Sequence, residues 1–250
     1  MLSEAIRPID KKTEQEYLYE KIHRGSSAAD GFSDKKTSAI LQERKTETME
    51  LQEKNRTEQK TDMQNKEKAL LTQLDEIAKQ DLCLAFSGGV DSSLLLKLVM
   101  DASAKYGTKV YAVTFQTRLH PPCDLETATR VAKEVGAVHE VLFVDELEQE
   151  AIRYNPENRC YLCKHYLFGK LLEFARDRGV TQVLDGTNED DLYVYRPGRK
   201  ALREYGVISP LAACHVTKTE VTALAAKYGV SVAHRPSTPC MATRLPYGAE

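Results

Sequence analysis

Residues 87–93 read Ser-Gly-Gly-Val-Asp-Ser-Ser, and this segment decides the fold of the chain. It follows an apolar run at residues 82–86 that is typical of a buried strand. It precedes residues 93–104, where apolar side chains recur with helical spacing. Adjacent glycines allow positive φ and a close approach of the backbone to a ligand. Free N–H groups and the dipole at a helix start favour an anion. The segment therefore predicts a phosphate-binding loop.

The loop differs from two familiar nucleotide motifs. It has no lysine where a Walker loop needs one, and it lacks the G-x-G-x-x-G dinucleotide fingerprint. Asp91 is unusual, because a carboxylate repels phosphate; we expect it to orient a magnesium ion or to cap the turn. An ordinary strand-to-helix turn is the alternative. The residues expected to bind the nucleotide here are Ser87, Gly88, Gly89, Asp91, Ser92 and Ser93.

Strands and helices are expected to alternate on both sides of this loop. The expected strands are residues 81–86, 109–115, 139–144 and 181–185. The expected helices are residues 66–80, 93–104, 125–135, 164–178 and 218–228. Such alternation predicts an α/β fold, a Rossmann-like parallel sheet with helices on both faces.

The composition limits the classes of protein to consider. The chain has 250 residues, 42% of them hydrophobic and 29% charged, with a formal net charge of -2. That balance does not favour a protein that coats nucleic acid. No apolar run is long enough to cross a bilayer, and no signal peptide is visible, so we expect a cytoplasmic protein without a membrane partner. Six cysteines in such a chain indicate metal binding or chemistry more than disulfides.

The first 65 residues differ from the rest. They are rich in Lys, Glu, Gln, Thr and Ser, with sparse apolar residues. Because such a stretch buries too little apolar surface to offset its ordering entropy, we expect a disordered extension over residues 1–65, with transient helix at about 37–66. The folded domain is expected over residues 66–250.

A second candidate loop follows the fourth expected strand, where residues 185–191 read Asp-Gly-Thr-Asn-Glu-Asp-Asp. Ligands of open parallel sheets bind at the carboxyl ends of the strands, so this loop should face the phosphate loop. Glu189 and Asp190 could hold magnesium, which prefers oxygen ligands. A solvated acidic turn is the alternative. Arg196, in the Arg-Pro-Gly sequence that follows, could grip an anionic substrate.

Cysteines supply a third signal. Cys160 and Cys163 form a C-x-x-C pair in an expected loop just before a helix, and Cys240 lies far away in the chain. The pair could be redox-active, half of a zinc site or an accident. Three thiolates could also hold a [4Fe–4S] cluster with one iron left open. We expect Cys83 in the core; Cys214, next to a histidine, keeps a zinc alternative open.

The phosphate loop resembles that of the PP-loop family of ATP pyrophosphatases, which share the adenine nucleotide alpha hydrolase-like fold. The resemblance implies that ATP is cleaved between its α and β phosphates and that the substrate is activated as an adenylate. It also implies that Phe115, at the end of the second expected strand, lies near the adenine. Gly186 and Thr187 would lie near the nucleotide.

Four segments in this order are similar to the LarE family of ATP-dependent sulfur transferases: residues 185–191, 196–198, 209–211 and 239–248. The resemblance covers about residues 66–250. It implies ATP- and Mg²⁺-dependent adenylation of a carboxylate of pyridinium-3,5-biscarboxylic acid mononucleotide, a small-molecule nucleotide. Sulfur is then installed there, in the synthesis of the nickel-pincer nucleotide.

The family has two sulfur sources, and both match this sequence. In one branch a single cysteine, matching Cys240, is sacrificed and becomes dehydroalanine. In another, three cysteines matching Cys160, Cys163 and Cys240 bind an iron–sulfur cluster. Arg196 and Arg244 are the residues we expect to bind substrate anions.

Two departures from the family stand out. Its members do not usually carry so long a polar extension, and they continue beyond the Tyr-Gly at residues 247–248, so we expect a domain cut short at its C-terminal end. We expect a homo-oligomer. The rival hypotheses are a tRNA thiolase of the same superfamily, which would need a basic surface, and a non-catalytic ATP-binding fragment.

Overall fold

The computed structural model describes residues 33–236 and 238–249, and the chain divides into two units, residues 1–57 and 58–250. The predictions for residues 1–32 lie outside the described residues. Helix α2 runs over Ser33–Ile77, so one continuous helix replaces the transient helix and the separate helix at 66–80 that the sequence suggests. Its side chains at residues 46–60 are exposed. Glu, Lys and Gln favour helix without needing a partner surface, which accounts for the difference.

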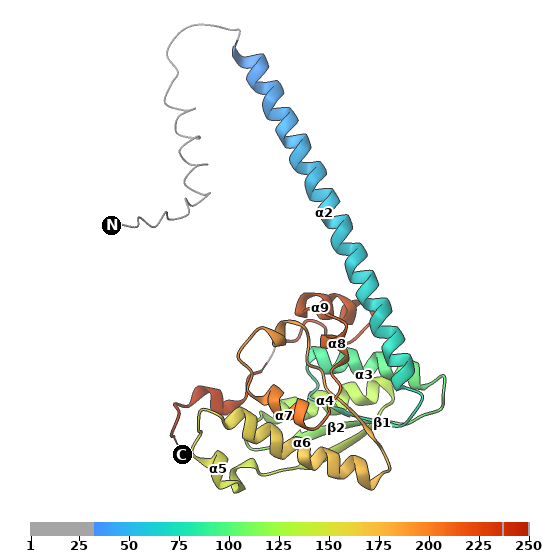
Figure 1. Cartoon of the computed structure of the whole chain (residues 1–250), viewed down its shortest axis with the longest axis vertical. Helices are drawn as coiled ribbons and strands as arrows, with labels where there is room; N and C mark the ends of the chain where they lie inside the picture. Colours follow the sequence, from blue (N-terminus) through green and yellow to red (C-terminus); the bar gives the residue numbers. More distant parts are fainter. Residues whose placement is uncertain (1–32, 237, 250) are drawn as a thin grey trace, which may run out of the picture. The chain divides into compact units, whose positions relative to one another are not determined.

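Four parallel strands form one sheet in the order β3-β2-β1-β4 (Figure 1). They are β1 (Leu82–Ala85), β2 (Val110–Gln116), β3 (Val138–Phe143) and β4 (Gln182–Leu184). All four predicted strands are confirmed, and each of their ends shifts by one residue. Central β1 pairs with β2 on one side and with β4 on the other, so the phosphate loop leaves the middle of the sheet.

The helices are α3 (Val90–Ser103), α4 (Pro122–Val135), α5 (Glu150–Arg153), α6 (Arg159–Asp177), α7 (Gly198–Glu204), α8 (Pro210–Ala213) and α9 (Lys218–Lys227). Short 3-10 turns lie at η1 (Glu146–Glu148), η2 (Asp190–Leu192) and η3 (Met241–Arg244). Among the described residues, no helix is both long and apolar enough to cross a membrane.

Alternate residues of the strands divide the core into two clusters, one on each face of the sheet. Leu82 and Leu84 of β1 point into a cluster with α3, α4, α9 and the last turns of α2. Cys83, between them, points into a second cluster built on α6 and α7. Because side chains alternate across a strand, this division confirms the predicted sheet with helices on both faces.

Helix α6 begins earlier than the sequence analysis suggests. The predicted helix started at residue 164 and left the C-x-x-C pair in a loop, but α6 begins at Arg159 and contains both cysteines. That prediction was wrong because the first turn carries no apolar stripe. Its buried residue is Arg159, a charged side chain that periodicity does not count as core. The two cysteines are therefore held on rigid helix.

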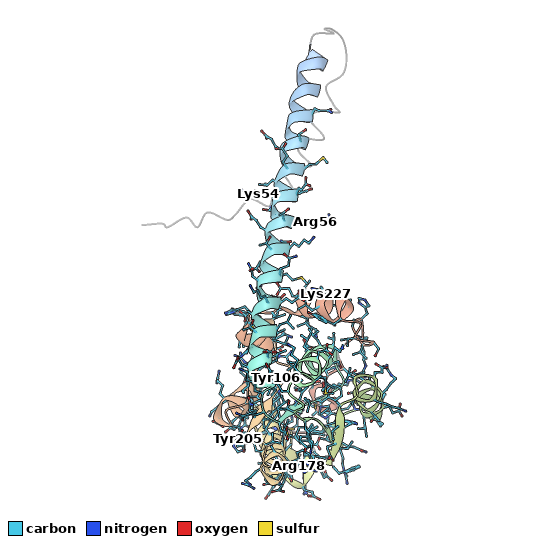
Figure 2. The ribbon with its side chains drawn as sticks, turned by 90° about the vertical axis from the view of Figure 1, so that its right-hand side faces the viewer. Lys54, Arg56, Tyr106, Arg178, Tyr205 and Lys227 are labelled. Carbon is cyan, nitrogen blue, oxygen red and sulfur yellow. The ribbon has the colours of Figure 1, made fainter. Side chains whose placement is uncertain are left out.

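Glu67 joins the C-terminal part of α2 to α9. Its carboxylate is buried and accepts hydrogen bonds from Lys227 at 2.7 Å and from the Tyr228 hydroxyl at 2.5 Å; Lys227 is labelled in Figure 2. Burial alone would raise the pKa of Glu67, but the bonds from Lys227 and Tyr228 outweigh it and the pKa lies below its usual value. Burial and the bond to Glu67 raise the pKa of Tyr228 to about 12.

We predict that Glu67→Ala destabilises the domain, because Tyr228 would keep a half-buried hydroxyl without its acceptor. Loss of bonds to a buried charge costs about 2 kcal/mol, which corresponds to a fall of roughly 4–8 °C in the midpoint of thermal unfolding. Exposed Glu76, paired with Lys79, is the matched control, and Glu76→Ala should change the midpoint little. Because the pKa of Glu67 is lowered on folding, its contribution to the free energy of unfolding is fully present above its unfolded pKa of about 4.3. That contribution is lost as the pH falls through the lower pKa of Glu67 in the folded protein. The difference in the midpoint of thermal unfolding between wild type and Glu67→Ala should therefore become smaller in acid. A difference that becomes larger there would contradict this account.

Candidate active site

The phosphate loop has the geometry that its glycines suggest. Gly88 has a φ of +70°, and a Cβ there would lie 2.8 Å from backbone atoms of Ala128 on α4. The Ser87 hydroxyl accepts from the Gly89 N–H at 3.3 Å and lies 3.2 Å from the Ser92 hydroxyl. These bonds hold the turn at the start of α3, where N–H groups are free to meet an anion. Ser93 instead points into the core, with its hydroxyl buried and unpaired.

The loop that follows β4 lies directly against the phosphate loop, as predicted. A Cβ on Gly186 would be 2.9 Å from the Ser92 nitrogen, so only glycine permits this approach. Buried Asp185 accepts hydrogen bonds of 2.5 Å from the hydroxyls of Thr187 and Ser209. Asp185 thereby ties this loop to the Ser-Pro-Leu segment at residues 209–211.

Asp91 has two partners from distant parts of the chain. Asn188 donates to one of its carboxylate oxygens at 2.9 Å, and the Lys218 ammonium forms an ion pair with the other. Sequence reasoning missed Lys218, although one signal was present. Lys218 is the first residue of α9, and a cation there is disfavoured by the helix dipole unless an anion faces it. The structure thus brings a lysine beside a loop that has none of its own.

The acidic residues expected to hold magnesium are engaged by protein groups. Glu189 accepts from the Tyr193 hydroxyl at 2.6 Å and lies 3.2 Å from His215. Asp190 accepts from the Lys218 backbone N–H at 2.9 Å. No group of three His, Cys, Asp or Glu side chains in the described part of the chain is arranged to hold a metal ion. The carboxylates therefore do not form a ready-made magnesium site, and the magnesium assignment stays a prediction.

The expected substrate arginines lie in different surroundings. Arg196 pairs with Asp191 at 2.9 Å, and its side chain is 59% exposed. Arg244, in η3, is exposed. Phe115 lies at the end of β2 with its ring 6.3 Å from that of Phe168 on α6. The structure does not bring these three residues into one contact cluster.

The three predicted cysteines gather around Arg159. Its buried guanidinium donates to the Cys160 sulfur at 3.1 Å and reaches the Cys240 sulfur at 4.0 Å. Burial opposes the charge of Arg159, but its interactions with Cys160, Cys240 and Cys163 outweigh burial and raise its pKa. Cys240, which is 80 residues from Cys160 in sequence, is therefore brought to the first turn of α6 by the fold.

Cys163 differs from the other two thiols in its surroundings. Burial, and secondly the charge of Glu146, raise the pKa of Cys163 to about 12. Glu146 is fully buried, and it accepts from the backbone N–H groups of Arg118 and Leu119. Cys163 is therefore a protonated thiol at neutral pH unless a ligand or a base removes its proton.

One contact joins the cysteine site to a neighbouring loop, and the chain from Arg235 to Cys240 connects it to the phosphate loop. A Cβ on Gly198 would lie 2.8 Å from Lys164 and 3.1 Å from the Cys160 carbonyl oxygen, so the Arg-Pro-Gly sequence packs on the start of α6. Arg235 donates to the Gly88 carbonyl of the phosphate loop at 3.4 Å and pairs with Asp124 at 2.6 Å. An extended chain covers at most about 3.6 Å per residue, so the Cα atoms of Arg235 and Cys240 lie within about 18 Å.

The remaining cysteines lie apart from this site. Cys83 is buried in the core, as expected, and burial raises its pKa to about 12. Cys214 donates to Gln73 at 3.3 Å, and the described residues around it form no metal-binding group. The fold thus assembles two groups of residues: the phosphate loop with Lys218, and three thiols around the Arg159 guanidinium.

Comparisons with known proteins show which sequences this chain is similar to. The model of the PP-loop domain matches residues 59–158. An uncharacterised protein of Synechocystis is 39% identical over 67% of this chain and 61% of its own length. The pyridinium-3,5-bisthiocarboxylic acid mononucleotide synthase of Lactiplantibacillus plantarum is 33% identical over 68% of this chain and 60% of its own. The chain thus spans about three fifths of these relatives.

A solved structure shows the same fold at low sequence identity. The NMN synthetase of Francisella tularensis has a TM-score of 0.53 and 15% identity, over 68% of this chain and 75% of that one. Its similarity supports the parallel α/β architecture and no more. The phosphate loop, the match to the PP-loop domain model and the sequence similarity to the synthase lead to one conclusion: the chain belongs to the PP-loop family, and its sequence resembles that of the LarE-type synthase.

Proposed function

We propose that this protein is an ATP-dependent sulfur transferase that adenylates a carboxylate of pyridinium-3,5-biscarboxylic acid mononucleotide and then installs sulfur. The observation that carries the proposal is the contact of Arg159 with the sulfurs of both Cys160 and Cys240, within chain reach of the phosphate loop. An acyl adenylate must meet a sulfur nucleophile before water does. A thiol site within chain reach of a nucleotide loop would meet that need.

Adenylation begins when a substrate carboxylate oxygen attacks the α-phosphorus of ATP and pyrophosphate leaves. The N–H groups at the start of α3 and the Lys218 ammonium would stabilise the charge that develops on the leaving phosphates. Asp91 and Asn188 orient this region, since Asp91 binds Lys218 and Asn188 together. The lysine missing from the loop is thereby supplied from α9.

Sulfur transfer then displaces AMP from the acyl carbon. If Cys240 is the donor, its thiolate forms a thioester and AMP leaves. Loss of the Cys240 α-proton then breaks the Cβ–S bond, leaving a thiocarboxylate on the product and dehydroalanine in the chain. Arg159, in contact with the Cys240 sulfur, would stabilise the thiolate charge.

The cluster route remains the alternative for the same three residues. Cysteine thiolates are suitable ligands of an iron–sulfur cluster. Within the described residues, however, the thiols surround the Arg159 guanidinium and do not form a metal-binding group. The contacts of Arg159 with the sulfurs of Cys160 and Cys240 support the direct thiol route.

A small nucleotide is favoured over tRNA as the substrate. The chain has 35 Lys and Arg against 37 Asp and Glu, whereas an RNA-binding enzyme needs an excess of basic surface. We further propose that the protein acts in the cytoplasm and that it is a homo-oligomer. Light scattering on the purified protein would test the oligomeric state.

The first prediction concerns Lys218. With ATP and the biscarboxylate nucleotide, the wild-type products should be AMP and pyrophosphate, and Lys218→Ala should lower the rate of AMP formation by about 100-fold because one preorganised charge is lost. Lys97→Ala, on the outer face of α3 where Lys97 pairs with Asp101, is the control and should retain the full rate. Chromatography of the nucleotides measures both. ADP and phosphate as main products would contradict the proposal.

The second prediction separates the two sulfur sources. If Cys240 is the donor, Cys240→Ala abolishes thiocarboxylate formation, whereas Cys160→Ala and Cys163→Ala retain it, and the wild-type peptide containing residue 240 loses the mass of H₂S after turnover. If a cluster is the donor, all three variants lose activity together with bound iron and sulfide after anaerobic purification. Cys214→Ala is the control. Full activity in all three variants would refute both routes.

A further inference from the structure

The segment that carries Cys240 has little structure of its own. Between residues 238 and 249 the only regular element is the short 3-10 turn η3, followed by a turn at residues 247–248. Two hydrogen bonds join it to other parts of the fold: the Met241 N–H donates to the Leu119 carbonyl at 2.9 Å, and Arg159 reaches the Cys240 sulfur. Apart from these, every hydrogen bond between residues 240–249 and the rest of the described chain is made by Asn155.

Asn155 holds this segment through both its side chain and its backbone. Its amide nitrogen donates to the carbonyls of Pro246 at 2.9 Å and Leu245 at 3.1 Å, with a longer contact of 3.4 Å to Ala242. Its own carbonyl accepts from the Gly248 N–H at 3.2 Å. One residue thereby contacts the turn immediately after Cys240 and the chain that follows.

Asn155 keeps an uncommon conformation to do so. Its φ is +46°, in the left-handed region that costs most residues energy and that asparagine tolerates better than most. The residue is 4% exposed, and its side-chain oxygen Oδ1 is buried without a partner. A strained backbone together with an unpaired buried oxygen persists only where the surroundings enforce it, and such residues gather at functional sites.

We propose that Asn155 is a positioning residue that latches the Cys240 segment against the start of α6, so that Cys240 faces Cys160. The consequence for sulfur transfer rests on the proposed function. The geometry of the latch does not depend on the proposed function. Asn155 lies four residues before Arg159, so the same stretch of chain holds the Cys240 segment and supplies the Arg159 guanidinium and the Cys160 thiol.

The chemistry of the amide explains why asparagine is needed. A latch that meets several carbonyl oxygens must be a donor, and the amide nitrogen carries two hydrogens. Aspartate has the same shape and also tolerates positive φ, but it presents only acceptors to those carbonyls. Glycine keeps the backbone conformation without any side chain. Asn155→Asp and Asn155→Gly therefore remove the side-chain bonds of the latch without imposing backbone strain, and they leave only the bond from the Gly248 N–H to the residue 155 carbonyl.

The test measures how close Cys240 lies to Cys160 in the full-length protein without ATP. Dibromobimane, which becomes fluorescent when it bridges two thiols, is added to each variant, and peptide mapping identifies the bridged pair. We expect a Cys160–Cys240 bridge in the wild type. The rate of bridging should fall at least about fivefold in Asn155→Asp and Asn155→Gly, the factor for one net hydrogen bond. Asn158→Asp, the same change at an exposed residue whose side chain makes no capping bond, should match the wild type.

Several results would overturn the latch. These are a wild type without the bridge, Asn155 variants that bridge at the wild-type rate, or an equal loss in Asn158→Asp. Circular dichroism and ATP affinity should be unchanged in both Asn155 variants. Global unfolding of both would also refute the proposal, because it would make Asn155 a residue of the fold as a whole.

The proposed function can fail separately from the latch. Bridging requires neither ATP nor substrate, so a normal bridging pattern in a protein that forms no AMP would refute the proposed function and leave the latch standing. Conversely, wild-type sulfur transfer in Asn155 variants that no longer bridge would show that the latch holds the segment without serving the reaction.

Discussion

The parallel direction of all four strands is the constraint on which the rest of the structure depends. Because parallel strands deliver their carboxyl ends to one edge, the loops after β1 and β4 meet there, and Gly186 approaches the Ser92 nitrogen so closely that no side chain fits between them. The Asp91 carboxylate then receives Asn188 from one loop and Lys218 from α9. The nucleotide site is thus a product of strand direction.

Electrostatics also organise the thiols. A buried guanidinium is costly unless it has polar partners, and Arg159 finds them in the sulfurs of Cys160 and Cys240. The environment of Cys163 is different, because burial and the charge of Glu146 raise the pKa of its thiol. The three thiols therefore differ in their surroundings: Cys160 and Cys240 contact the Arg159 guanidinium, whereas burial and the charge of Glu146 act on Cys163.

Sequence reasoning succeeded where a signal is local. The phosphate loop, the four strands and the core position of Cys83 follow from periodicity and from glycine, whose effects act within a few residues. It failed at the start of α6, because a buried arginine looks like surface in a pattern of apolar residues. It also overlooked Lys218 and Arg235, whose partners Asp91, Gly88 and Asp124 are more than 100 residues away.

The sequence by itself determined the kind of site: a helix start built to bind phosphate, and cysteines in number and spacing suited to chemistry. Only the tertiary structure decided which groups meet. Cys240 meets Arg159, which also binds Cys160, although 80 residues separate the two cysteines, and Asp91 faces a lysine because α9 packs beside α3. Local residue preferences act over a few residues, whereas contacts between distant segments depend on how the whole chain packs its core.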